Sequence, residues 1–190
     1  MDLQQFALQL RDMFTKPKGV HADGVSYGPA MSRWSKTPIN FVPETHSPNI
    51  NGYYDWSPTK EKIVINPSSL EHKNKVTTIG NTIRHESIHA LLTNALKKSG
   101  VDVSDVNNIT NAYRILGQEL PEHYKIVQSI RGKRDGIMPV EVPAYAGQPD
   151  YAQFGISAPL RNSYTHNLVE SLKGIDPDAS KIYQRMTGAK

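Results

Sequence analysis

The longest helical pattern in the chain runs over residues 76–98 and reads VTTIGNTIRHESIHALLTNALKK. Apolar residues recur on several sides of this helix, so we expect a central helix that is packed on most of its faces. Only a narrow stripe is expected to face solvent, formed by Gly80, Ser87, Asn94 and Lys98. Ser99 and Gly100 predict the C-terminal end.

Two histidines of this helix are spaced to hold one metal ion, in the pattern His85-Glu86-Ser87-Ile88-His89. His89 lies about 40° around the helix from His85 and about 6 Å along it, so both imidazoles can reach the same ion. Glu86 lies about 100° from His85, where it is placed to bond a water molecule rather than to coordinate the metal. We therefore predict His85 and His89 as metal ligands and Glu86 as a general base. The competing interpretation is a pair of hydrogen-bonded core histidines.

A catalytic zinc site needs a third protein ligand. The preferred candidate is Glu141, in the stretch VEVPAY over residues 140–145. A carboxylate within an apolar run is costly to bury unless it meets a cation. The competing interpretation is that Glu141 is a surface charge beside a proline-containing turn. Four further residues remain open as the third ligand: Glu119, Glu122, His123 and Asp135.

Tyr145 follows Glu141 by one helical turn and lies on the same face if that segment is helical. Its hydroxyl could donate a hydrogen bond to a developing oxyanion, which makes Tyr145 a candidate catalytic residue. The alternatives for this role are Tyr113, Tyr124 and His166. A tyrosine in this position is more commonly part of a core.

The remaining patterns predict a mostly helical α+β fold with a small sheet before the central helix. We expect a helix over residues 2–14, a proline-rich loop segment over 16–50, and a hairpin formed by Gly52–Trp56 and Lys62–Asn66. Further helices are expected at about Ser104–Leu116, Pro121–Ile130, Pro159–Lys173 and Pro177–Met186. The chain is predicted to be a single domain over residues 1–190, with a core at about 50–150 and C-terminal helices over 156–190.

The chain resembles the zincin metallopeptidases, of the small gluzincin-like type. The resemblance rests on His85-Glu86-x-x-His89, on Glu141 in its Glu-x-Pro-Ala-Tyr context and on the preceding hairpin, and it covers about Gly52–Gly147. It implies a zincin-like domain in which His85, His89 and Glu141 bind one Zn²⁺ per chain and Glu86 is the general base of peptide hydrolysis. It also implies that an edge strand just before the active helix pairs with an extended substrate, and Lys62–Asn66 matches that strand by position.

Composition excludes several other classes. The 190 residues include no cysteine, which excludes disulfides, thiol catalysis and cysteine-bound zinc. The net charge of +4 is a mild excess of scattered basic residues, so we expect a peptide or protein substrate and no nucleic-acid partner. Neither a membrane-spanning run nor a secretory signal is recognised, so we expect no membrane association and a cytoplasmic location, or a virion-associated one if the protein is phage-encoded.

Two other functions compete with a general peptidase. One is a catalytically silent zincin-like structural or binding protein, such as a phage or mobile-element component, whose zinc stabilises the fold or a partner interface. The intact Glu86 argues against it, because a structural site has no use for a base. The other is a regulatory protease that cuts one cytosolic protein. The oligomeric state is not predicted.

Overall fold

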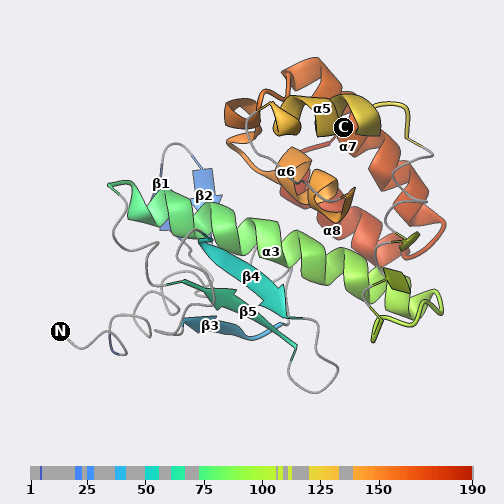
Figure 1. Ribbon diagram of the computed structural model, residues 1–190, viewed down its shortest axis with the longest axis horizontal. Coiled ribbons are helices and arrows are strands. Elements are labelled where there is room, and N and C mark those ends of the chain that lie inside the picture. The colour runs from blue at the N-terminus through green and yellow to red at the C-terminus, as the bar shows by residue number, and fades with distance from the viewer. Residues whose placement is uncertain are drawn as a thin grey trace. The chain divides into compact units, whose positions relative to one another are not determined.

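The computed structural model describes residues 5, 20–22, 25–27, 37–41, 50–55, 61–66, 73–105, 107–108, 111–112, 120–132 and 139–189 (Figure 1). They form a mostly helical α+β fold with a small sheet before the long helix, as the sequence predicts. The chain contains two compact units, residues 1–90 and 91–190. One continuous helix, α3 (Lys75–Lys98), contributes residues to both units. That the whole chain is a single domain stays a prediction.

Strand β5 (Lys62–Ile65) is the central strand of the sheet in the first unit. On one side it pairs antiparallel with β4 (Gly52–Asp55), which confirms the predicted hairpin. On the other side it pairs in parallel with β3 (Ile39–Phe41). Residues 63–65 of β5 are almost completely buried, as is typical of a strand that is covered on both faces.

The strand order corrects two predictions. The edge position predicted for Lys62–Asn66 is wrong, because β5 is hydrogen-bonded on both sides and β3 and β4 form the edges of the described sheet. The segment over 16–50 is not only loop. It contains β3 and an antiparallel pair formed by β1 (Val20–Ala22) and β2 (Val25–Tyr27). Each of these strands has three residues, which is too short for an alternating pattern to be recognised.

A half-buried carboxylate links the three strands of the sheet. Glu61, directly before β5, accepts hydrogen bonds from the Tyr54 hydroxyl at 2.9 Å and from the Thr37 hydroxyl at 3.2 Å. Tyr54 belongs to β4, and Thr37 precedes β3. One oxygen of Glu61 therefore ties both neighbours of β5 to the start of that strand.

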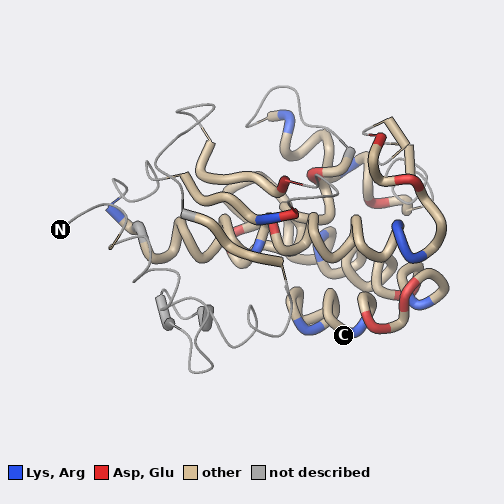
Figure 2. The backbone as a smooth tube through the Cα atoms, turned by 90° about the horizontal axis from the view of Figure 1, so that it is seen from below, with Lys and Arg blue, Asp and Glu red and all other residues tan. Residues whose placement is uncertain are grey.

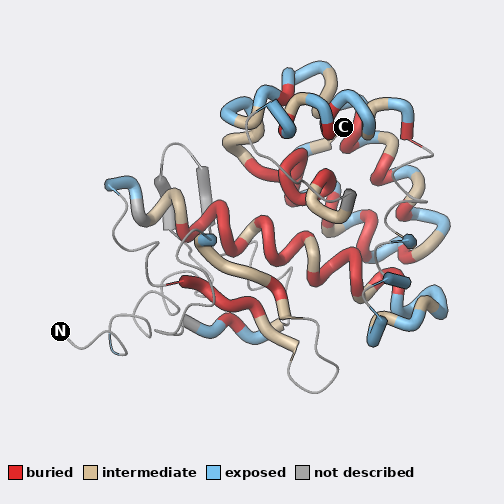
Figure 3. Tube along the Cα trace, viewed as in Figure 1, coloured by how far each residue is buried: buried red, intermediate tan, exposed pale blue. Residues whose placement is uncertain are grey.

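Helix α3 is buried along most of its length, which confirms the prediction of a central helix (Figure 3). The predicted solvent stripe is wrong at Gly80 and Ser87, which are both buried, and correct at Lys98, which is exposed. Small residues are compatible with solvent, but they also let a neighbouring element approach closely, and the pattern alone does not separate these cases. The helix ends as predicted, with Gly100 in the left-handed conformation at φ +94°.

The helices of the second unit confirm the predicted ones closely. They are α5 (His123–Arg131), α7 (Ala158–Lys173) and α8 (Pro177–Thr187). Between α5 and α7 lie elements that were not predicted individually: a 3-10 turn over Pro139–Glu141, the short helix α6 (Val142–Gly147) and a 3-10 turn over Tyr151–Phe154.

Two predicted helices fall largely outside the described residues. Of the helix over 2–14, only Gln5 is described, and it is helical. Of Ser104–Leu116, residues 107–108 and 111–112 are helical, whereas residues 104–105 form a turn and a bend, so the predicted start of this helix is wrong.

Basic and acidic residues are interspersed along the described backbone (Figure 2). Within the same residues, no helix has both the length and the apolar character that crossing a bilayer requires.

Asp176 joins the end of α3 to the start of α8. Its Oδ1 accepts hydrogen bonds from the backbone N–H groups of Asp178 and Ala179, and its Oδ2 accepts one from Lys98 Nζ at 2.6 Å. Burial acts to raise the pKa of Asp176, but the hydrogen bond from Lys98, the N–H bonds and the lysine charge together hold this pKa below its ordinary value. The ionised carboxylate is therefore the form that stabilises the fold.

We predict that Asp176→Asn lowers the free energy of unfolding near neutral pH by up to about 1 kcal/mol, because asparagine keeps the helix cap and loses the ion pair. The folded-state pKa is the lower one, so this difference is complete above the unfolded-state value of 3.8 and disappears as the pH falls below it. Urea denaturation at several pH values measures it. Asp178→Asn, at an exposed carboxylate of the same helical turn, is the control and should show a smaller difference.

Candidate metal centre

The two predicted histidine ligands face one another on α3. His85 Nε2 and His89 Nε2 lie 3.1 Å apart, so the ring that carries its proton on Nε2 donates a hydrogen bond to Nε2 of the other ring. The two rings are 4.9 Å apart between centroids and meet edge to face at 70°. Two nitrogens bound to one tetrahedral zinc at about 2.0–2.1 Å lie about 3.3 Å apart. The pair is therefore already close to the spacing that a shared zinc ion requires.

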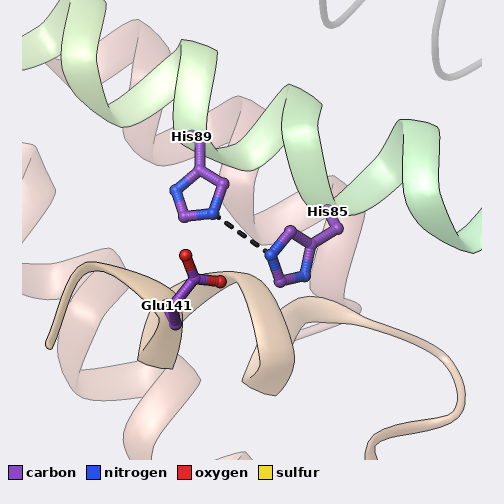
Figure 4. Close-up of side chains that lie close together, drawn as sticks. All are labelled: His85, His89 and Glu141. Atoms are coloured by element: carbon purple, nitrogen blue, oxygen red, sulfur yellow. Dashed lines mark hydrogen bonds between the residues drawn. The ribbon is translucent and has the colours of Figure 1, made fainter. Parts of the chain in front are cut away.

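Glu141 lies beside this pair, as the sequence predicts for the third ligand (Figure 4). The ligand atoms of His85, His89 and Glu141 all lie within 4.8 Å of one another. Among the histidines, aspartates and glutamates that the structure describes, these three form the one group that could hold a metal ion. His85 is buried, and the other two are half-buried. Two imidazoles and a carboxylate, with no thiol, are a donor set that suits zinc.

The local sequence explains how Glu141 is held. It ends the 3-10 turn over Pro139–Glu141 and directly precedes α6, with a helical backbone at φ −77° and ψ −23°. Pro143 lies in the first turn of α6, where a missing N–H leaves no intrahelical hydrogen bond unmade. The turn and the helix therefore form one nearly continuous helical segment that begins before Glu141.

Glu86, the predicted base, follows His85 on α3 and is 7% exposed. A carboxylate buried to this extent destabilises the fold unless polar groups or a cation compensate it. Glu86 is therefore buried directly after a predicted ligand in sequence, and its role as a general base stays a prediction.

Tyr145 lies one turn after Glu141, on α6, as the helical prediction requires. It is 6% exposed, and its ring meets that of Phe154 edge to face at 4.5 Å between centroids. This contact contributes to the burial of the ring. A role for the hydroxyl in catalysis stays a prediction.

The described alternatives to Glu141 and Tyr145 lie in other surroundings. Glu122 accepts hydrogen bonds from Ser163 at 2.5 Å and Asn167 at 3.1 Å. His123 is half-buried against Tyr164, and burial lowers the pKa of its imidazole. Tyr124 and His166 are exposed. Glu119, Asp135 and Tyr113 lie outside the described residues.

The sheet approaches α3 one turn before the histidines, through a residue that the sequence analysis missed. A Cβ atom on Gly52, at the start of β4, would lie 2.5 Å from the carbonyl oxygen of Val64 and 2.8 Å from Cγ2 of Thr82. Only glycine allows this approach, and Thr82 precedes His85 by three residues. A glycine that opens a strand pattern is the signal in the sequence that could have indicated it.

Comparisons with known proteins do not add to this picture. No family model matches the chain, and comparisons with curated proteins and with solved structures likewise find no match.

We predict that Gly52→Ala lowers the free energy of unfolding by about 1–3 kcal/mol, because the new methyl group overlaps a backbone oxygen that cannot move freely. Gly174→Ala is the matched control. There the nearest atom to a new Cβ is the carbonyl oxygen of Ser171 at an ordinary 3.6 Å. Urea denaturation of both variants measures the effect, and equal stability would contradict the close approach of Gly52 to Val64 of β5 and Thr82 of α3.

Proposed function

We propose that the protein is a zinc-dependent metallopeptidase that hydrolyses peptide bonds. The observation that carries the proposal is the grouping of His85, His89 and Glu141 within 4.8 Å, with the buried carboxylate of Glu86 directly after the first ligand. Two imidazoles and one carboxylate form a ligand set of catalytic zinc sites and leave one coordination position open. The resemblance to the zincins supports the same assignment.

Each residue has a separate role in this proposal. Zinc held by the three ligands would supply a Lewis acid that polarises the scissile carbonyl and lowers the pKa of water. Glu86 accepts a proton from the attacking water and delivers it to the leaving amine. The rigid helix that carries His85 and His89 also carries Glu86, so the base keeps a constant position relative to two ligands. Tyr145 remains the candidate donor to the oxyanion.

The proposed substrate is a peptide or protein segment in extended conformation. Such a segment can add to an exposed sheet edge through main-chain hydrogen bonds. β4 lies at an edge of the described sheet, is antiparallel to β5, and begins where Gly52 packs on Thr82 of α3. The role that the resemblance assigns to an edge strand therefore moves from Lys62–Asn66 to β4.

The cytoplasmic location predicted from the sequence is part of the proposal, and cell fractionation would test it. The catalytically silent zincin-like protein is the alternative function. A fourth protein ligand on the metal would favour that alternative, because structural zinc sites are closed by four protein ligands.

Protein purified without chelators or a histidine tag should contain about one zinc ion per chain by elemental analysis.

Glu141→Gln should weaken zinc binding at least about tenfold, because the loss of a ligand lowers the affinity at least as much as the loss of a residue that orients a ligand. Glu122→Gln is the matched control and should keep the wild-type affinity, since Glu122 is bonded to Ser163 and Asn167. Unchanged affinity in Glu141→Gln, or an equal loss in both variants, would contradict the ligand assignment.

Glu86→Gln should reduce hydrolysis of casein or a fluorogenic peptide at least about 100-fold, because it removes the general base and keeps the shape of the side chain. Bound zinc should be unchanged. Glu170→Gln, at an exposed carboxylate paired with Lys173, is the control and should stay active. Full activity in Glu86→Gln would overturn the assignment of the base. A zinc-loaded wild type that cuts no peptide would favour the silent alternative.

A further inference from the structure

Helix α6 depends on its neighbours for its position. It has six residues, all of them buried. A helix of this length is not stable on its own, so packing and hydrogen bonds from other elements must determine where it lies. Glu141 directly precedes α6, so whatever holds this helix also determines where the backbone of Glu141 lies.

A tyrosine of α8 holds the first turn of α6. The hydroxyl of Tyr183 donates a hydrogen bond to the carbonyl oxygen of Pro143 at 3.0 Å. Tyr183 is completely buried, so water cannot replace this bond. Pro143 lies two residues after Glu141, in the same helical segment.

An arginine of α7 holds the last turn of α6. Arg161 Nε donates to the carbonyl oxygen of Ala146 at 3.0 Å, and its Nη2 donates to the carbonyl oxygen of Thr187, at the end of α8, at 2.5 Å. The guanidinium also lies 4.7 Å above the ring of Tyr151. Helix C-termini carry partial negative charge, which a planar cation with several fixed donors is suited to bridge.

We infer that Tyr183 and Arg161 are positioning residues for the metal ligand Glu141. Each fixes one carbonyl of α6, one near the start of the helix and one near its end, and together they restrict both its translation and its rotation. This inference rests on the proposed function, because it takes Glu141 as a metal ligand. Both side chains donate to backbone carbonyl oxygens of α6, so they act on Glu141 through the backbone of this helix.

The test is Tyr183→Phe, which removes one hydroxyl and keeps the buried ring. Zinc affinity, measured by competition with a chromogenic chelator, should fall about tenfold, as is typical when a residue that orients a ligand is lost. The visible spectrum of the Co²⁺-loaded protein should also change, because it reports the geometry of the ligands. A purely structural role would leave this spectrum unchanged.

Ser180→Ala is the matched control. Ser180 is also buried on α8, and its hydroxyl donates to a backbone carbonyl, that of Val169 on α7, at 2.7 Å. This variant should lose a similar amount of stability in urea and keep the wild-type zinc affinity and Co²⁺ spectrum. If both variants weaken zinc binding equally, or if neither does, the inference is wrong.

Arg161→Lys provides a second variant. It keeps the charge and loses the planar donors, so we expect weaker zinc binding with an altered Co²⁺ spectrum. In a Glu141→Gln background, Tyr183→Phe should cause no further loss of zinc affinity. If it does, Tyr183 does not act through Glu141.

If Glu141→Gln alone leaves the affinity unchanged, the ligand assignment fails and the inference fails with it. If Glu141→Gln weakens binding and Tyr183→Phe does not, only the inference fails.

Discussion

The burial of polar side chains on α3 is the constraint on which the rest of the structure depends. His85 and Glu86 are 8% and 7% exposed on a helix that also supplies the core with isoleucine and leucine. Buried polar groups destabilise a fold unless each of them meets a partner. The facing nitrogens of His85 and His89, and the carboxylate of Glu141 beside them, meet part of this need. A cation held by these three groups would compensate the negative charges of the carboxylates as well. The burial of these side chains and the binding of a metal would therefore favour the same residues at these positions.

The parts of the structure that the sequence predicted correctly are those with local causes. The limits of α3 follow from its apolar pattern and from Gly100, which is free to adopt a positive φ. The β4–β5 hairpin follows from two β-rich runs separated by a short polar loop. Glu141 was predicted by a physical argument of a different kind, the cost of a carboxylate inside an apolar run; the structure places it beside the histidines, and its role as a metal ligand stays a prediction.

The parts that were missed have causes far away in the chain. Nothing in residues 39–41 indicates that they pair with β5, and this pairing is what makes β5 central instead of an edge. The burial of Ser87 depends on what packs against α3 and not on the helix itself. The bond from Tyr183 to Pro143 joins residues 40 positions apart, and the tyrosine has no neighbours in sequence that would distinguish it from any other core aromatic. Periodicity identifies elements, whereas contacts between distant elements depend on three-dimensional packing.

The mixed strand order also has a consequence for the order in which the first unit assembles. The β4–β5 hairpin closes a loop over residues 56–61, and such hairpins form in about 1–10 μs. The parallel pair must enclose residues 42–61, with a larger loss of chain entropy. We therefore expect β5 to pair with β3 after β4, when the Glu61 oxygen that accepts the hydrogen bond from Tyr54 can also accept the one from Thr37. In the native protein β3 pairs with β5 over three residues and β4 pairs with it over four, so we expect the amide protons of β3 to exchange with solvent before those of the hairpin.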